Sequence, residues 1–279
     1  MLVVSTIEEL RAELAKLKKV GKKGALVPTM GALHKGHLGL ISQVQEEADY
    51  VAVSIFVNPT QFLPLEDLSK YPRTLQTDLD ACEDMGVDLV FTPSVEEMYT
   101  QNAHIQFSVS KIADEMCGKS RPGHFEGVVQ VVNKLFNLFQ PDVAIFGQKD
   151  FQQFRIIKAM INEFNHPVKL IMAPTAREHD GLARSSRNRY LTEIERKQAP
   201  LLYQCIKQIK DAIYKTRTVD LSTVTATLNA SELKIDYLNV YGVKDLAPID
   251  KPELGNTYVI AGAVYAGRTR LIDNELIKL

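Results

Sequence analysis

The chain has 279 residues, and its 33 lysines and arginines nearly balance 34 aspartates and glutamates, which gives a formal net charge of −1. A hydrophobic share of 45% and a charged share of 24% are ordinary for a globular protein and exclude a disordered or fibrous chain. Balanced charge creates no broad attraction for a polyanion, so we expect no nucleic-acid partner. The sequence shows no run of about 18 apolar residues and no secretory leader, so we expect a cytoplasmic protein without membrane association.

Three cysteines, Cys82, Cys117 and Cys205, are widely spaced and include no C-x-x-C pair. An odd number of such thiols is typical of a protein in a reducing compartment. None has a basic partner in the sequence that would activate it, so we expect buried thiols and no covalent intermediate on the enzyme.

Apolar residues at helical spacing mark the first predicted helix, which begins at Ile7 and can be capped by Ser5 or Thr6. Strands and helices then alternate as far as residue 173. In chain order we expect a strand over Gly24–Pro28, a helix from Gly36 to Asp49, a strand over Tyr50–Val57, a helix over Thr74–Met85, a strand over Val87–Phe91, a helix over Phe125–Phe139, a strand over Asp142–Phe146, a helix over Phe151–Phe164 and a strand over Val168–Ala173. This alternation predicts an α/β fold with a Rossmann-like parallel sheet and helices on both faces.

The composition changes near residue 175, where charged residues and serines become frequent. Beyond it we expect one long helix from Thr192 to Tyr214 and strands over Leu233–Val240, Thr257–Ala261 and Arg268–Asp273. The sequence therefore predicts two domains, residues 1–175 and a smaller α+β domain over residues 176–279. Parallel α/β sheets bind ligands at the carboxyl ends of their strands, so the polar loops after Val27, Val57 and Phe146 are expected to open onto one crevice.

Two histidines lie between the first strand of the alternating region and the helix that follows it. His34 and His37 are three residues apart, so in a first helical turn their side chains share a face. Gly31 and Gly36 permit close approach of the backbone to a ligand. A helix N-terminus attracts phosphate and disfavours imidazolium, and neutral imidazoles there can donate hydrogen bonds to phosphate oxygens during displacement at phosphorus.

Other interpretations of this pair remain open from spacing alone. An H-x-x-H pair can bind a metal, although no third ligand is close in the sequence, and two loop histidines can also be unrelated. Competing phosphate motifs are missing, since no G-x-G-x-x-G follows a strand. Gly118-Lys119-Ser120 looks like the end of a P-loop, but Ala113 takes the place of its first glycine and no suitable strand precedes it.

The segment PTMGALHKGHLGLI, residues 28–41, contains a string that resembles the H-x-G-H signature of the nucleotidyltransferase superfamily. Over its full length the segment resembles the pantoate–β-alanine ligase family. Further segments resemble that family in the same order: SIFVNPTQF (Ser54–Phe62), YPRT (Tyr71–Thr74), RPGHFEGV (Arg121–Val128), PDVAIFGQKDFQQ (Pro141–Gln153), SSRNRYL (Ser185–Leu191) and RLIDN (Arg270–Asn274). The resemblance spans nearly the whole chain. It implies an ATP- and pantoate-binding catalytic domain over residues 1–175, a lid domain over residues 176–279, and a homodimer.

The resemblance also implies the site residues. The ATP-binding positions are Met30, Gly31, His34, His37, Gly147, Gln148, Lys149, Asp150, Ala176, Arg184, Ser185, Ser186 and Arg187. The substrate-binding positions are Asn58, Gln61, Gln153 and Arg121, and the catalytic positions are His37, His34 and Lys149. The residue types suit these roles, because amides bind carboxylate or hydroxyl oxygens without adding charge, while lysine, serine and arginine side chains bind phosphates. The family often has Leu or Met at the position of Arg184, and the separate roles of Arg121 and His124 stay open.

The reaction implied by the resemblance has two steps. The carboxylate of (R)-pantoate attacks the α-phosphorus of ATP and expels pyrophosphate, and β-alanine then attacks the pantoyl adenylate and releases AMP. The protein mainly has to align the reactants and neutralise developing charge. Mg²⁺ is expected to bridge phosphate oxygens with few protein ligands, so its protein ligands stay unassigned.

Three other functions share part of this pattern. A nucleotidylyltransferase would use H-x-G-H but keep the nucleotide in its product and consume no β-alanine. A class I aminoacyl-tRNA synthetase fits less well, because the chain is short and lacks a basic RNA-binding module. A nucleotide-sensing module would bind ATP without releasing pyrophosphate when pantoate is added.

Overall fold

The computed structural model describes residues 1–64, 66–100 and 104–279 of the chain. These residues form two compact units. Unit 1 comprises Met1–Val109, Pro122–Gly147 and Ile156–Pro174, and unit 2 comprises Ser110–Arg121, Gln148–Arg155 and Thr175–Leu279. Two short segments from the first part of the chain therefore belong to unit 2.

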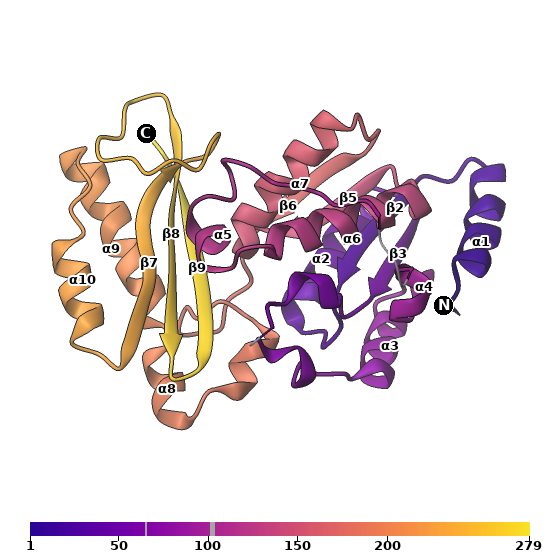
Figure 1. Ribbon diagram of the computed structural model, residues 1–279, viewed down its shortest axis with the longest axis horizontal. Coiled ribbons are helices and arrows are strands. Elements are labelled where there is room, and N and C mark those ends of the chain that lie inside the picture. Colours follow the sequence, from indigo (N-terminus) through magenta and orange to yellow (C-terminus); the bar gives the residue numbers. More distant parts are fainter. Residues whose placement is uncertain (65, 101–103) are drawn as a thin grey trace. The chain divides into compact units, whose positions relative to one another are not determined.

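Unit 1 contains a six-stranded parallel sheet in the order β1-β4-β3-β2-β5-β6, and Figure 1 labels β2, β3, β5 and β6. Its strands are β1 (Leu2–Val4), β2 (Gly24–Thr29), β3 (Tyr50–Ile55), β4 (Leu89–Phe91), β5 (Val143–Gly147) and β6 (Lys169–Ala173). The predicted α/β class with a parallel sheet is confirmed. Strand β1 was not predicted, because three residues are too few to show an alternating pattern.

The helices of this unit cover both faces of the sheet. They are α1 (Ile7–Lys19), α2 (Lys35–Gln45), α3 (Leu75–Asp84), α4 (Val95–Met98), α6 (His124–Phe139) and the greater part of α7 (Phe151–Glu163), with short 3₁₀ turns η1 (Pro59–Gln61) and η2 (Asp67–Ser69). Ile41 and Val44 of α2 pack against alternate strand residues such as Ala25 and Val27. Leu26 lies between these two and is fully buried on the opposite face, because neighbouring strand residues point to opposite sides.

The strand order places two loops of unit 1 at one edge of the sheet. The chain runs outward from β2 through β3 to β4 and then returns to β5 on the other side of β2, so the order reverses between β2 and β5. Thr29 at the end of β2 pairs with Ile55 at the end of β3 in the parallel ladder. All the carboxyl ends therefore lie at the same edge, where α/β sheets bind ligands.

Unit 2 is built on a three-stranded antiparallel sheet in the order β7-β8-β9 (Figure 1). Its elements are α5 (Met116–Ser120), η3 (Gln148–Asp150), η4 (Ser186–Tyr190), α8 (Glu193–Gln198), α9 (Leu201–Thr216), α10 (Ser222–Asn229), β7 (Leu233–Gly242), β8 (Thr257–Ala266) and β9 (Thr269–Lys278). Helix α9 packs on the sheet, and its buried residues Ile206 and Ile209 belong to one apolar cluster with Ile260 and Val264 of β8. The smaller α+β architecture predicted for this part of the chain is present.

The single long helix predicted from Thr192 is wrong. Helix α8 ends at Gln198 and α9 begins at Leu201, with Pro200 between them. Proline has no N–H to donate to the carbonyl four residues earlier, so the helical hydrogen bonding is interrupted there although Ala199 itself keeps a helical conformation. Thr192 does cap α8, in a reciprocal pair of hydrogen bonds with Glu195.

All three cysteines are buried and unpaired, as predicted. Burial, together with the nearby Asp78 carboxylate, raises the pKa of the Cys82 thiol to about 11. A thiol with a raised pKa is a poor nucleophile at neutral pH, which agrees with a structural role for Cys82.

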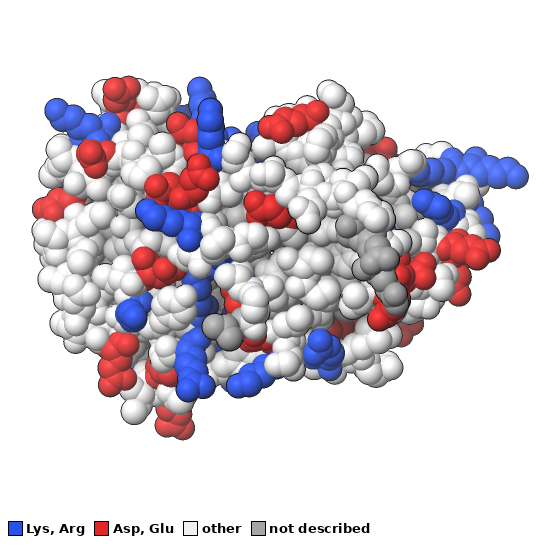
Figure 2. All heavy atoms as spheres, viewed as in Figure 1, with Lys and Arg blue, Asp and Glu red and all other residues white. Residues whose placement is uncertain are grey.

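The surface carries charges of both signs. On the face shown in Figure 2, lysines and arginines lie among aspartates and glutamates rather than forming one field of a single sign. No helix in the described part of the chain combines the length and the apolar character that crossing a membrane requires.

Gly127 allows α6 to lie directly against the turn η1. A Cβ at this position would come within 2.3 Å of the Thr60 carbonyl oxygen and 2.7 Å of the Gln61 nitrogen. We expect Gly127→Ala to lower the free energy of unfolding by about 1–3 kcal/mol, the usual effect of overpacking, measured by urea denaturation. Gly39→Ala is the control, because Gly39 is an exposed α2 residue whose added Cβ meets nothing within 4 Å.

Gly39→Ala should instead raise the free energy of unfolding by about 0.4–1 kcal/mol, because alanine restricts the unfolded chain. Equal unfolding free energies for the two variants would contradict the packing argument at Gly127.

Candidate active site

The loop between β2 and α2 has an unusual backbone conformation that a buried carboxylate holds in place. Gly31 and Ala32 both have positive φ angles, of 78° and 51°. This region is unfavourable for alanine, so the surrounding structure must stabilise it. Asp78 of α3, only 2% exposed, accepts hydrogen bonds from Ala32 N at 2.9 Å and Leu33 N at 2.7 Å. The hydroxyl of Thr74 donates to the same carboxylate.

This loop leads into the two histidines at the start of α2. His34 is the N-cap residue, and its Nδ1 accepts a hydrogen bond from Gly36 N at 3.1 Å. His37 Nδ1 in turn accepts from His34 N at 3.3 Å. The rings stack with centroids 4.0 Å apart and planes inclined by 24°.

These two capping bonds fix the tautomer of both imidazoles. A nitrogen that accepts a hydrogen bond carries no proton, so each neutral ring bears its proton on Nε2. Two stacked rings, each with an Nε2–H donor, therefore lie at a helix N-terminus, where the backbone dipole also favours an anion. The arrangement suits a phosphate group that gains charge during a reaction.

Amide side chains follow β3, the next strand of the same sheet. Asn58 is 1% exposed, and its Nδ2 donates to Gln61 Oε1 at 3.0 Å and to the Gly127 carbonyl at 3.1 Å. Its Oδ1 accepts from the hydroxyls of Thr60, at 2.9 Å, and Tyr99, at 2.8 Å. Burial raises the pKa of Tyr99 to about 12, so this phenol remains a donor at neutral pH. Both ends of the Asn58 amide are thus engaged inside the protein.

Gln61 lies beside both the histidine loop and α6. Its side-chain Nε2 lies 3.1 Å from Met30 Sδ. Its backbone carbonyl oxygen lies 2.7 Å from His124 Nδ1. His124 is the first residue of α6 and is 8% exposed. The amide of Gln61 is therefore oriented by Asn58 on one side and placed next to Met30 on the other.

The other predicted positions belong to unit 2, except Gly147, which ends β5 in unit 1. Gln148, Lys149 and Asp150 form the turn η3, and Lys149 Nζ lies 3.3 Å from Asp150 Oδ1. Gln153 lies in the first turn of α7. Arg121 follows the short helix α5 as its C-cap, and Gly118-Lys119-Ser120 lies within that helix instead of forming a phosphate loop.

The serine- and arginine-rich segment forms the 3₁₀ turn η4 with a capped start. Ser185 Oγ accepts from Arg187 N at 3.3 Å, and Ser186 is 9% exposed. Arg184 pairs with Glu178 at 2.9 Å, and its backbone N donates to the Ala176 carbonyl at 2.9 Å. Ala176 and Arg184 thus close the base of the segment that carries the two serines.

Sequence reasoning missed Asp78 and gave no role to Asp273 and Asn274. Asp78 occupies the buried side of α3 together with Cys82, one turn later. A carboxylate at a buried helix position was the signal available in the sequence, because unpaired charges are rarely buried. Asp273 and Asn274 end the RLIDN segment, whose resemblance carried no role for either residue.

Within the part of the chain that the structure describes, no group of three or more His, Cys, Asp or Glu side chains is placed to hold a metal ion. Among these residues, His34 and His37 are therefore not joined by a third His, Cys, Asp or Glu side chain placed to share a metal ion.

We expect Asp78→Asn to loosen the loop between β2 and α2. The substitution keeps the side-chain shape but replaces one acceptor oxygen with an NH₂ group that faces a backbone N–H. Leaving such a buried donor without an acceptor should lower the free energy of unfolding by about 1–3 kcal/mol. Hydrogen exchange at Ala32 N and Leu33 N should accelerate more than exchange in β3. Asp84→Asn, at the exposed end of the same helix, is the control and should change neither measurement.

A parallel α/β sheet that presents an H-x-G-H helix start next to the reversal of its strand order agrees with the resemblance to the nucleotidyltransferase superfamily. Residues 2–276 match the sequence model of the family described as Pantoate-beta-alanine ligase. The chain belongs to the pantoate-beta-alanine ligase family.

Relatives support this assignment over the full length of the chain. The pantothenate synthetase of Pseudomonas savastanoi pv. phaseolicola is 48% identical, with 98% of each chain covered. That of Lysinibacillus sphaericus is 47% identical, with 99% of this chain and 98% of the relative covered.

Solved structures agree with the fold. Pantothenate synthetase from Thermus thermophilus is 40% identical and superimposes with a TM-score of 0.91, covering 99% of both chains. The pantoate-beta-alanine ligase of Francisella tularensis, solved in complex with beta-gamma ATP and beta-alanine, is 35% identical with a TM-score of 0.84. It covers 99% of this chain and 97% of its own.

Proposed function

We propose that this chain catalyses the ATP-dependent condensation of (R)-pantoate with β-alanine, giving pantothenate, AMP and pyrophosphate. Membership of the family supports the reaction, and the two stacked imidazoles at the start of α2, whose Nδ1 atoms accept the capping bonds, are the observation in this chain that carries it. In the first step a carboxylate oxygen of pantoate bonds to the α-phosphorus, and the bond to the β-phosphate oxygen breaks. In the second step the amine of β-alanine bonds to the activated carbonyl carbon, loses a proton and displaces AMP.

His34 and His37 act on the α-phosphate in this proposal. Negative charge grows on the non-bridging oxygens as the pantoate oxygen approaches, and the two N–H donors stabilise that charge without reorienting. Asp78 contributes indirectly, because it fixes the loop that leads to both histidines. Met30 and Gly31 in that loop complete the proposed ATP contacts of unit 1.

The proposed residues of unit 2 neutralise the phosphates that leave as pyrophosphate. Lys149 supplies a compact positive charge, while Ser185, Ser186 and Arg187 supply hydroxyl and guanidinium donors. Gln148, Asp150, Ala176 and Arg184 belong to the same two segments. These groups bind ATP, so they should affect the first step more than the second.

Gln61 and Gln153 bind pantoate in this proposal, and Gln61 also binds β-alanine. An amide can bind both a carboxylate and a hydroxyl, which suits a site that holds two different substrates in turn. Asn58 supports Gln61 from inside the protein, because its own amide is fully engaged. Arg121 offers a cation for a substrate carboxylate.

We further propose that Mg²⁺ arrives with ATP, since this ion usually keeps water molecules and substrate phosphates as ligands. Asp150 in the turn η3 places a carboxylate next to Lys149, with Lys149 Nζ 3.3 Å from its Oδ1. When bound, the ion would neutralise phosphate charge. A cytoplasmic homodimer in pantothenate and coenzyme A biosynthesis is the setting that the family resemblance favours.

The reaction is tested by measuring pyrophosphate and AMP with each substrate omitted in turn. We expect pyrophosphate from ATP and pantoate alone in a single turnover, and steady release of AMP only when β-alanine is added. Pyrophosphate release that requires a phosphorylated alcohol, with the nucleotide kept in the product, would indicate a nucleotidylyltransferase. ATP binding without any pyrophosphate would indicate a binding module.

The role of His37 is tested by a substitution that removes its Nε2–H donor and keeps an acceptor near the position of Nδ1. His37→Asn places an amide oxygen near the position of Nδ1, so the capping bond from His34 N can persist while the Nε2–H donor is lost. We expect an unchanged melting temperature and a pyrophosphate burst about 10²–10³-fold slower, the usual effect of removing a donor to a developing anion. A burst at the rate of the unsubstituted protein would contradict the proposed role.

A further inference from the structure

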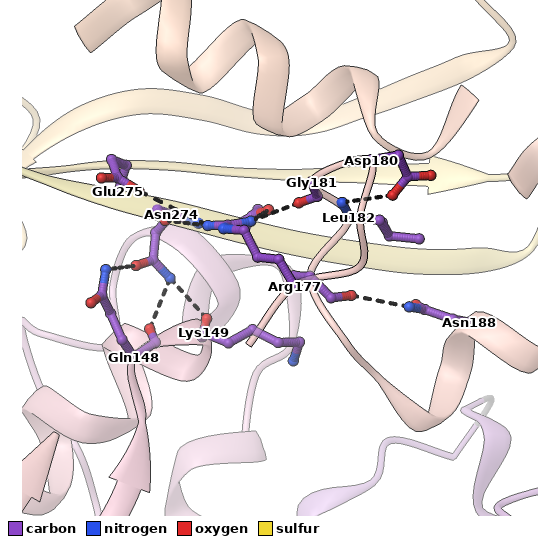
Figure 3. A network of polar contacts seen from close by, with 11 residues as sticks. Gln148, Lys149, Arg177, Asp180, Gly181, Leu182, Asn188, Asn274 and Glu275 are labelled. Atoms are coloured by element: carbon purple, nitrogen blue, oxygen red, sulfur yellow. Dashed lines mark hydrogen bonds and ion pairs between the residues drawn. The ribbon is translucent and has the colours of Figure 1, made fainter. Parts of the chain in front are cut away.

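Two adjacent residues of β9 each hold one of the proposed ATP-binding segments of unit 2. Asp273 is 4% exposed and Asn274 is 2% exposed, so both polar side chains lie in the interior of the unit. Figure 3 shows Asn274 pointing to the turn that contains Gln148 and Lys149, with Arg177 extending along the same strand. Both residues end the RLIDN segment, which the proposed reaction leaves without a role.

Asn274 uses its whole amide on the turn η3. Its Nδ2 donates to the carbonyl oxygens of Gln148, at 2.9 Å, and Lys149, at 2.8 Å. Its Oδ1 accepts from Gln148 Nε2 at 3.4 Å. An amide nitrogen has two hydrogens, so these bonds use both of them. The backbone that carries the Lys149 side chain is therefore fixed by one residue of β9.

Asp273 fixes the base of the serine- and arginine-rich segment through Arg177. The guanidinium makes two parallel bonds to the carboxylate, Nη1 to Oδ2 at 2.6 Å and Nη2 to Oδ1 at 2.9 Å. Such a pair is both strong and directional. Burial raises the pKa of the Asp273 carboxyl, and the bonds from Arg177 oppose that rise.

Arg177 is tied in turn to the segment that ends at η4. Its Nη1 also donates to the Gly181 carbonyl at 3.0 Å, and its guanidinium carbon lies 3.4 Å from the centre of the Tyr203 ring. Its backbone pairs with Ala183 in an isolated antiparallel bridge. The residues that lead into Ser185 are thus held at the point where Arg177 meets Asp273.

We propose that Asp273 and Asn274 are positioning residues that fix the Lys149 turn and the serine- and arginine-rich segment to one point of β9. The inference rests on the proposed function, because it assigns both segments to ATP. Neither residue needs to touch a substrate. Each acts through another group, Asn274 through Lys149 and Asp273 through Arg177 and Arg187.

A double-mutant cycle tests the role of Asn274. We expect Asn274→Ala to weaken Mg·ATP binding about tenfold by calorimetry, and to change KM for pantoate less than twofold. In a Lys149→Ala background the same substitution should change ATP binding less than about twofold, because groups that act through one another are non-additive. A full tenfold loss in that background would overturn the inference.

Asn239→Ala is the matched control for this cycle. Asn239 pairs with Ala261, which pairs with Asn274 in the same row of the sheet, and its side chain accepts only from Val240 N among the contacts described. We expect ATP binding and melting temperature close to those of the unsubstituted protein. A loss of ATP binding equal to that of Asn274→Ala would mean that any asparagine of this sheet has the same effect, and would overturn the inference.

The role of Asp273 is tested by a second double-mutant cycle, which combines Asp273→Asn with Arg187→Ala and measures ATP binding as before. If Asp273→Asn does not fold by circular dichroism, Arg177→Lys takes its place, since lysine keeps the charge but cannot make two parallel bonds. A different result would contradict the proposed function, namely that the unsubstituted protein binds ATP but releases no pyrophosphate with pantoate. Additive losses in both cycles would overturn the positioning role while leaving that activity intact.

Discussion

The hydrogen bonds from Gly36 N to His34 Nδ1 and from His34 N to His37 Nδ1 combine a structural requirement with a chemical one. The first N–H groups of any helix need acceptors, and here imidazole nitrogens provide them. Meeting that need decides which nitrogen of each ring keeps its proton. The chemistry proposed for the site therefore depends on how α2 begins, and the start of α2 depends on the loop that Asp78 holds.

A similar relation between backbone and side chain recurs in unit 2. Lys149 offers a flexible side chain, but the turn beneath it is fixed by two bonds from one amide. The Arg177 guanidinium donates two hydrogen bonds to the Asp273 carboxylate. In both units, buried polar residues orient the backbone, while more accessible residues on that backbone carry the proposed function. Such supporting residues decide how closely a site keeps its geometry.

The sequence predicted the elements that depend on local signals. The strands β2, β3 and β5 are short apolar runs bounded by glycine, proline or charge, and the structure has them within about two residues of the expected ends. Pro200 is visible in the sequence too, although the helix predicted from Thr192 runs through it. The supporting residues could not be placed in this way, because Asp78 meets Ala32 across 46 residues and Asn274 meets Lys149 across 125. Contacts of that range depend on tertiary structure, which periodicity does not encode.

The membership of Gln148–Arg155 in unit 2 makes that unit depend on residues that lie far apart in the sequence. The carbonyl groups of the Lys149 turn lie at least 125 residues before Asn274 in the chain, so the turn is synthesised well before its partner. Contacts between distant parts of a chain form late because long loops must close first. Asn274 follows every strand of the parallel sheet in the chain, so a chain cut before residue 274 would keep the histidine pair and lack the two bonds that hold the Lys149 turn.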